Sequence, residues 1–283
     1  MIKLFAIDMD GTLLNSDDKI SDETIMAIRK LNQAGVQSVL CTGRIITSTE
    51  YANSILKIDN PMIGNNGAII KLNNEKILNT HPMADEDIKD LIDFCEANKV
   101  NYHFYDEDTF YSNTLNPRSL HHLRIDTDYG INIQCNLEIS KDPYKRLKDK
   151  GHNALKILVG NLDTHPLGEL ELVKMFEDRY ADRLYITTSG PGSIEIMDPK
   201  VNKYEGVLEL AEFLGIKSDE IAAIGDSHND LPMLENANLA FAMGNANQTV
   251  KDVAKYTVDD NNSLGIAQAV DIILEYNKDN PSV

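Results

Sequence analysis

The chain is poor in cysteine, contains no tryptophan and has no long apolar run. Its 283 residues include three cysteines, Cys41, Cys95 and Cys135. They are too few and too scattered for a disulfide framework or a zinc cluster, so we interpret them as small core residues in a reducing compartment. No stretch approaches the roughly 20 apolar residues that a membrane helix needs. The first apolar run is broken by Asp8 and Asp10 and has no small-residue cleavage site after it, so we expect a cytoplasmic protein with no membrane partner.

Basic residues are also in the minority. The 27 Lys and Arg residues face 45 Asp and Glu residues, which gives a formal net charge of −18. Nucleic acid and anionic membranes bind clustered Lys and Arg, so we expect neither as a partner. A phosphorylated metabolite would be repelled as well. Any phosphate site must therefore be made locally positive by a metal ion, a lysine or backbone N–H groups.

Strand and helix patterns alternate at both ends of the chain, and this order predicts an α/β fold with a doubly wound parallel sheet. At the start, the predicted elements are a strand at Ile2–Ile7, a helix capped by Ser21, a strand at Val36–Cys41, a helix at Thr47–Leu56, a strand at Pro61–Gly64 and a hairpin of Ala68–Leu72 with Lys76–Leu78. The parallel pattern resumes from Ser193 with Lys203–Leu214 (helix), Ile221–Ile224 (strand), Leu231–Glu235 (helix), Leu239–Ala242 (strand) and Leu264–Tyr276 (helix).

The middle of the chain has a different character and predicts an inserted α+β unit. Helices are expected at Asp85–Lys99, Pro117–Asp126 and Pro166–Arg179, and strands at Tyr102–Tyr105, Thr109–Tyr111, Ile131–Leu137, Leu155–Gly160 and Leu184–Thr188. We therefore expect a core domain of residues 1–82 and 191–283 and an inserted cap domain of residues 83–190. The cap is rich in aromatic residues, which are either substrate contacts or cap core: Tyr102, Phe104, Tyr105, Phe110 and Tyr111.

Two carboxylates follow the first strand, where a buried strand meets a glycine turn. Residues two positions apart on an extended chain face the same side, so Asp8 and Asp10 should point into one small space. This space lies at the carboxyl end of a strand, where open α/β sheets bind their ligands. Two carboxylates so close repel each other unless a cation or a shared proton lies between them. The pair therefore favours a metal-assisted reaction.

Three further segments place polar side chains beside the predicted core strands. Thr42, Gly43 and Arg44 follow the second strand, Lys203 begins a helix, and the segment from Asp226 to Asp230 follows a later strand. The carboxyl ends of parallel strands lie along one edge of a sheet, so the four segments can converge although they are far apart in sequence.

Together the segments match, in order, the D-x-D-G-T-L, S/T-G-R, Lys and G-D-x-x-N-D pattern of the haloacid dehalogenase superfamily of phosphotransferases. Within it, the chain resembles the Cof-type sugar-phosphate phosphatases. Asn65-Asn66-Gly67-Ala68 and Met243-Gly244-Asn245-Ala246 also look like that subgroup. The resemblance covers the whole chain and implies a Rossmann-like core whose inserted cap closes as a lid. The chain departs from the family at Asn202 and Tyr204, which stand beside Lys203 where the family more often has small residues.

The resemblance implies a Mg²⁺-dependent phosphatase of small phosphorylated metabolites, with Asp8 as the nucleophile and Asp10 as the general acid and base. The metal would be held by Asp8, the backbone carbonyl of Asp10 and Asp226, with Asp230 in its outer shell. The groups expected to bind the phosphate or the substrate are Lys203, the Thr42 hydroxyl, backbone N–H groups near Met9 and Gly43, Asn229 and Arg44.

Two other functions fit the same residues. A phosphomutase of this fold would return the phosphoryl group to the sugar. A non-catalytic protein could bind a phosphometabolite, although a binder gains nothing from a second acid beside Asp8. Both a monomer and a dimer are compatible with the sequence.

Overall fold

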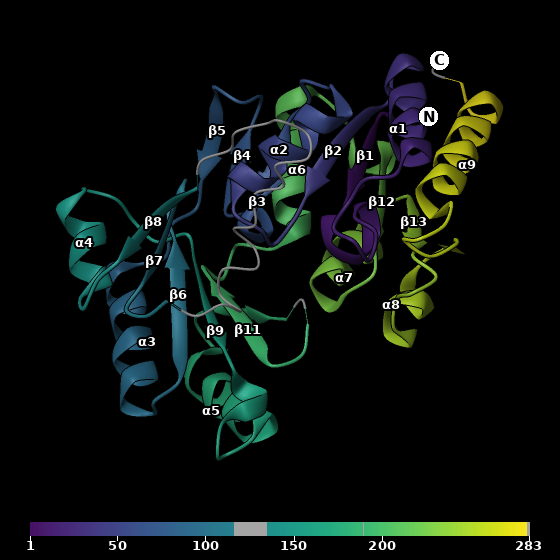
Figure 1. Ribbon diagram of the computed structural model, residues 1–283. Helices are drawn as coiled ribbons and strands as arrows, with labels where there is room; N and C mark the ends of the chain where they lie inside the picture. The colour runs from purple at the N-terminus through teal and green to yellow at the C-terminus, as the bar shows by residue number, and fades with distance from the viewer. Residues whose placement is uncertain (116–134, 189, 282–283) are drawn as a thin grey trace.

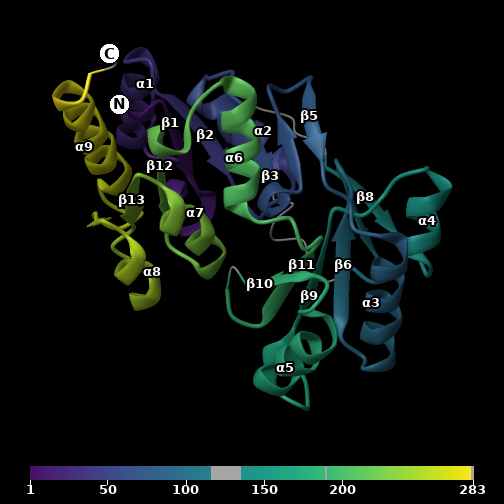
Figure 2. The same ribbon diagram turned by 180° about the vertical axis from the view of Figure 1, so that it is seen from behind.

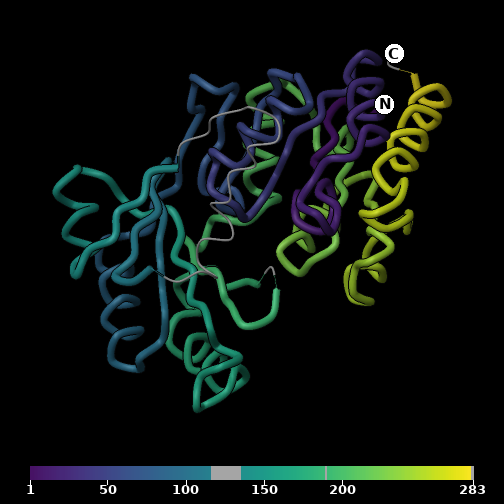
Figure 3. The backbone as a smooth tube through the Cα atoms, viewed as in Figure 1, coloured from purple at the N-terminus to yellow at the C-terminus, as the bar shows by residue number. Residues whose placement is uncertain are grey.

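The computed structural model describes residues 1–115, 135–188 and 190–281. The two ends of the chain form a larger lobe, and the middle forms a smaller one (Figure 1). The backbone tube leaves the larger lobe after β5 and returns to it before α6 (Figure 3). The predicted helix at Pro117–Asp126 and the first part of the predicted strand Ile131–Leu137 lie outside the described residues.

The larger lobe is built on a mixed sheet whose order is β14-β13-β12-β1-β2-β3-β4-β5. The strands from β14 to β3 are parallel, whereas β4 and β5 add an antiparallel hairpin at one edge. This confirms the predicted doubly wound sheet and its hairpin. The strands are β1 (Leu4–Ile7), β2 (Gln37–Cys41), β3 (Met62–Gly64), β4 (Ile69–Lys71), β5 (Ile77–Thr80), β12 (Ile221–Gly225), β13 (Leu239–Ala242) and β14 (Tyr256–Thr257).

Helices cover both faces of this sheet because its strands are apolar on both sides. Phe5 and Ile7 of β1 pack with α1 (Asp22–Gln33), α2 (Ile46–Leu56) and α9 (Gly265–Asp279). Leu4 and Ala6 pack on the opposite face, with α6 (Lys203–Leu214), α7 (Leu231–Asn236) and α8 (Gln248–Val253), and Figure 2 shows α6 and α7 on the near side. Such strands read as continuous apolar runs, the pattern typical of a parallel sheet.

Local signals explain where the helices begin. The Ser21 side chain accepts a hydrogen bond from the Thr24 backbone N–H at 3.2 Å, so it caps α1 as predicted. Asn202 caps α6 in the same way, accepting from the Glu205 N–H at 3.0 Å. Each cap sets the residue at which its helix begins. Because Asn202 caps α6, Lys203 is the first residue of that helix.

The smaller lobe is an antiparallel sheet with a parallel strand at one edge, in the order β10-β11-β9-β6-β7-β8. Its strands are β6 (Asn101–Tyr105), β7 (Thr109–Ser112), β8 (Asn136–Ile139), β9 (Lys156–Gly160), β10 (Tyr185–Thr187) and β11 (Ser193–Met197). One face packs against α3 (Asp85–Ala97), α4 (Pro143–Asp149) and α5 (Glu169–Tyr180). Tyr102, Phe104 and Tyr111 lie in that core, whereas Tyr105 and Phe110 pack against Ile45 of the larger lobe.

The sheet pairing corrects one prediction. The parallel pattern was expected to resume at Ser193, yet β11 pairs antiparallel with β9 and β10 in the smaller lobe. The chain returns to the larger sheet only with α6. The apolar alternation of β11 is compatible with either sheet. Sequence periodicity predicts a strand here, but it does not predict with which strands that strand pairs. Among the described residues, none of the helices combines the length and the apolar character needed to span a membrane.

Candidate active site

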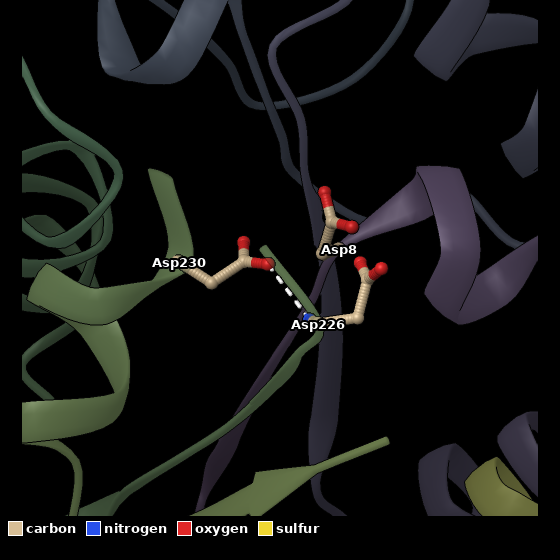
Figure 4. A group of neighbouring side chains, drawn as sticks. All are labelled: Asp8, Asp226 and Asp230. Carbon is tan, nitrogen blue, oxygen red and sulfur yellow. Dashed lines mark hydrogen bonds between the residues drawn. The ribbon is translucent and has the colours of Figure 1, made fainter. Parts of the chain in front are cut away.

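The neighbouring strands β1 and β12 bring two acidic residues together at their carboxyl ends. Ile7 pairs with Ile224, so Asp8 and Asp226 follow strands that end side by side. Asp230 lies in the turn that follows β12. One carboxylate oxygen of each of Asp8, Asp226 and Asp230 lies within 4.8 Å of the others (Figure 4). The convergence predicted from strand order is therefore seen for these three residues, which we call the acidic group.

Gly11 allows the turn after β1 to approach this group. The turn Met9–Leu13 closes with hydrogen bonds from the Leu13 N–H to the Asp8 carbonyl (3.2 Å) and from the Leu14 N–H to the Met9 carbonyl (2.9 Å). Gly11 has φ of 72°, and a Cβ on it would overlap the Asp226 carboxylate. The Met9 side chain is buried in the core, so only its backbone is available to a ligand.

Asp226 is fixed by two further polar residues. Thr12 Oγ1 donates to Asp226 Oδ1 at 3.3 Å. Asn245 Nδ2 donates to the Gly11 carbonyl at 2.8 Å and to Asp226 Oδ2 at 3.4 Å. Neither residue was assigned a role from the sequence, although Thr12 lies in the D-x-D-G-T-L segment and Asn245 in the Met243-Gly244-Asn245-Ala246 segment. Both hold Asp226 without adding charge.

Lys203 places a positive charge against the acidic group. Its side chain is fully buried, and its Nζ donates to Asp8 Oδ1 at 2.5 Å and to Asp230 Oδ1 at 2.6 Å. Burial by itself would lower the pKa of the ammonium, but Asp230 and Asp8 outweigh it and raise the pKa well above the usual range. Lys203 therefore stays charged and holds two carboxylates at once.

Asp230 uses its second oxygen to shape its own turn. Asp230 Oδ2 accepts the backbone N–H groups of Asp226 and Ser227, each at 2.9 Å, and the first of these bonds is drawn in Figure 4. Both oxygens of Asp230 therefore have protein donors. This arrangement fits a residue that positions the group better than one that binds a ligand directly.

The group has more negative than positive charge, and the pKa values reflect this. Burial, followed by the Asp230 charge, raises the pKa of Asp226 to about 7. Burial and Asp230 also raise the pKa of Asp8, against the opposing effect of Lys203. Carboxylates at this spacing call for a cation, and oxygen ligands are those that Mg²⁺ prefers.

Asp10 is bound by Arg44 and not by Lys203. Arg44 Nε lies 2.8 Å from Asp10 Oδ2, and Arg44 Nη2 bonds Asp10 Oδ1, so the guanidinium grips the carboxylate with two nitrogens. The Arg44 backbone N–H in turn donates to Thr42 Oγ1 at 3.1 Å. Arg44 was expected from the sequence to bind the phosphate or the substrate, and in the structure its guanidinium holds Asp10. His228 is exposed, and its Nδ1 lies 3.3 Å from Asn247 Nδ2.

A pocket opens between the two lobes beside these residues. The larger lobe lines it with Asp8, Asp10, Gly43, Arg44, Ser227 and Asn229, and the smaller lobe with Tyr105, Lys156 and Glu195. Sequence reasoning missed Lys156 and Glu195. The signal was present, since each is a charged residue inside an apolar strand, in Leu155–Val159 and Ile194–Ile196. Asn229 lies in the pocket wall, where its Nδ2 donates to Asn66 Oδ1 at 3.1 Å.

Comparison with known proteins agrees with this geometry. Residues 5–270 match the family of haloacid dehalogenase-like hydrolases. The chain is 32% identical to the 5-amino-6-(5-phospho-D-ribitylamino)uracil phosphatase YcsE of Bacillus subtilis, over 95% of this chain and 94% of that protein. It is 27% identical to the phosphatase YwpJ of the same organism, over 96% and 100%. A solved haloacid dehalogenase-like hydrolase from B. subtilis superposes with a TM-score of 0.83 at 26% identity, over 95% and 99% of the two chains. The chain belongs to the haloacid dehalogenase-like hydrolases, as a phosphatase of the Cof type.

Proposed function

We propose that this phosphatase hydrolyses phosphate monoesters of small metabolites, of the sugar-phosphate class, with Mg²⁺ and through an aspartyl-phosphate on Asp8. The observation that supports it best is the contact of Asp8 with the buried Lys203 ammonium, inside a group of three carboxylates that borders a pocket. Two B. subtilis relatives, 32% and 30% identical, are named as phosphatases of a ribityl phosphate, a sugar-alcohol phosphoester.

The acidic group fits a divalent cation. Asp8, Asp226 and the backbone carbonyl of Asp10 would hold Mg²⁺, and Asp230 would keep its fixed place beside them. Bound there, Mg²⁺ supplies positive charge that offsets the anionic oxygens of the phosphate. Burial and the neighbouring Asp230 charge raise the pKa of Asp226, and a bound cation would oppose both effects.

The protein groups then divide the reaction between them. An oxygen of Asp8 attacks phosphorus, and the bond from phosphorus to the leaving oxygen breaks as Asp10 gives that oxygen a proton. Asp10 next takes a proton from a water molecule, whose oxygen attacks phosphorus. The bond from phosphorus to Asp8 breaks, which releases inorganic phosphate and restores the carboxylate.

Neutral and cationic groups around Asp8 stabilise the phosphoryl oxygens during both steps. Lys203, the Thr42 hydroxyl, Asn229 and backbone N–H groups near Met9 and Gly43 take this role in the proposal. Arg44 keeps the Asp10 carboxyl group at the pocket wall, beside Asp8 in the pocket lining.

The test is turnover of p-nitrophenyl phosphate and of a sugar-phosphate panel, with and without Mg²⁺. We expect Mg²⁺-dependent release of inorganic phosphate. Asp8→Asn should abolish turnover and keep the melting temperature, while Asp271→Asn, a change at an exposed surface carboxylate, should keep activity. Full activity of Asp8→Asn would rule out the nucleophile. An isomerised sugar phosphate in place of free phosphate would favour the mutase, and tight binding without turnover would favour a binding protein.

A further inference from the structure

Two charged residues of the smaller lobe are buried although that lobe's own core does not need them. Lys156 on β9 and Glu195 on β11 are each 2% exposed, and Lys156 Nζ lies 3.2 Å from Glu195 Oε1. A buried ion pair is weak evidence of stabilisation, because desolvation of both charges offsets most of their attraction. These two side chains lie on the sheet face opposite α3, α4 and α5, and both reach into the larger lobe.

Their partners there belong to the two loops that frame the phosphate site. Lys156 Nζ donates to the Gly43 carbonyl, and Asn66 Nδ2 donates to Glu195 Oε2. The two loops are also tied to each other, because the Asn66 N–H donates to the Thr42 carbonyl at 2.9 Å. The smaller lobe thus holds both loops from outside.

The chain of contacts continues to Asn229. Asn66 presents its Oδ1 to Asn229 Nδ2 at 3.1 Å while its Nδ2 is held by Glu195. The orientation of the Asn66 amide therefore depends on a carboxylate from the other lobe. Asn229 Oδ1 is buried without a hydrogen-bond partner, so it is an acceptor left for a water or a ligand hydroxyl at the pocket wall. The second hydrogen of Asn229 Nδ2 is the donor that a phosphoryl oxygen would take.

The fit at this junction is tight. A Cβ on Gly43 would lie 2.9 Å from Asn66 Oδ1 and 3.1 Å from Glu195 Oε2. Asn66 itself has φ of 56°, a left-handed backbone that its surroundings must hold in place. A shift of the smaller lobe would therefore remove a donor from Gly43 and an acceptor from Asn66 together.

We propose that Glu195 and Lys156 are positioning residues that couple docking of the smaller lobe to assembly of the phosphate site. When the lobe is docked, Glu195 orients Asn66 and through it Asn229, and Lys156 fixes the Gly43 carbonyl, so that the loop groups face the phosphoryl oxygens. When the lobe withdraws, these groups lose their partners. By reciprocity, a ligand that needs the assembled phosphate site favours the docked lobe. The inference rests on the proposed phosphatase activity at Asp8.

Glu195→Gln tests the coupling, because it keeps the shape of the side chain but removes the charge that faces Lys156. Misplacement of reacting groups by about 1 Å can cost on the order of 10²-fold in rate. We expect kcat for p-nitrophenyl phosphate to fall roughly 10- to 100-fold and the inhibition constant of inorganic phosphate to rise with it. Glu50→Gln is the matched control, since Glu50 pairs with the largely buried Lys71 away from the pocket; it should change neither constant.

A double-mutant cycle separates action through Asn66 from contact with the leaving group. If Glu195 acts through Asn66, the double variant Glu195→Gln/Asn66→Ala should be no slower than the slower single variant. Additive losses, or an unchanged inhibition constant for phosphate, would overturn the proposal, and so would wild-type rates in Glu195→Gln. A wild-type protein without phosphatase activity would instead defeat the function proposed above, so the two failures are distinguishable.

Discussion

Replacement of Lys203 by methionine removes the only protein cation that contacts the acidic group in the described part of the chain. The change leaves Asp8 and Asp230 buried without the ammonium that now lies 2.5 and 2.6 Å from them. Loss of one partner from a buried ion pair costs about 3–5 kcal/mol of unfolding free energy. At roughly 2 °C per kcal/mol for a chain of this size, the melting temperature should fall by about 6–10 °C.

The loss should depend on pH with a definite sign. Burial raises the pKa of Asp8 already, and removal of Lys203 takes away the effect that opposes it. The folded variant then holds protons more tightly than the unfolded chain, so its unfolding free energy decreases as pH rises above the unfolded pKa of about 3.9. Between pH 5 and 8, the variant should lose stability with rising pH more steeply than the wild type.

Thermal unfolding across this pH range, with and without Mg²⁺, is the measurement. Mg²⁺ should recover more of the melting temperature in Lys203→Met than in the wild type, while turnover stays low. Lys71→Met serves as the control for removal of a largely buried lysine, and it should retain activity. A fall of less than about 1 kcal/mol, the scale of an exposed pair, would refute this account of Lys203.

Three further outcomes are expected. Gly11→Ala should raise the Mg²⁺ concentration needed for half-maximal activity more than it lowers kcat, because its Cβ would displace the Asp226 carboxylate; a Mg²⁺ titration of activity measures this. The Mg²⁺ affinity should rise with pH through about 7, since Asp226 must lose its proton to bind and the raised pKa of Asp8 acts in the same direction; calorimetric titrations from pH 5.5 to 8 would show a flat profile if this is wrong. Iodoacetamide at pH 8 should leave activity intact, because burial raises the pKa of the Cys41 thiol to about 12; inactivation traced to Cys41 would contradict this.

The parallel core was predictable because its signals are local. The apolar run before Asp8 continues through both faces of the strand, and the order of elements leaves few topologies for a parallel sheet. Once β1 and β12 are neighbours, Asp8 and Asp226 must meet. The predicted N-cap at Ser21 needed only the residues within one helical turn.

The junction between the lobes was not predictable in this way. Lys156 and Glu195 interrupt apolar strands, which marks them as unusual, but their partners Gly43 and Asn66 lie more than a hundred residues away in the sequence. No periodicity records which face of the inserted sheet meets the core. For the same reason, the sequence did not predict that β11 would pair with β9 in the smaller lobe and not with a strand of the larger sheet.

The charge count of the acidic group shows how the proposed metal would remove the repulsion that a phosphate meets in a protein with a net charge of −18. With all groups ionised, Asp8, Asp226 and Asp230 carry three negative charges and Lys203 one positive charge, so 3 − 1 = 2 remain uncompensated. A divalent cation balances these two negative charges, whereas a monovalent cation leaves one of them uncompensated. Asp10 is already matched by Arg44. In the proposal, neutral donors around the pocket then hold the phosphate, and Asn66 and Gly43 help to align them. In the proposed reaction, the charge of the acidic group therefore makes phosphate binding depend on the metal, and the smaller lobe helps to set the geometry of the donors.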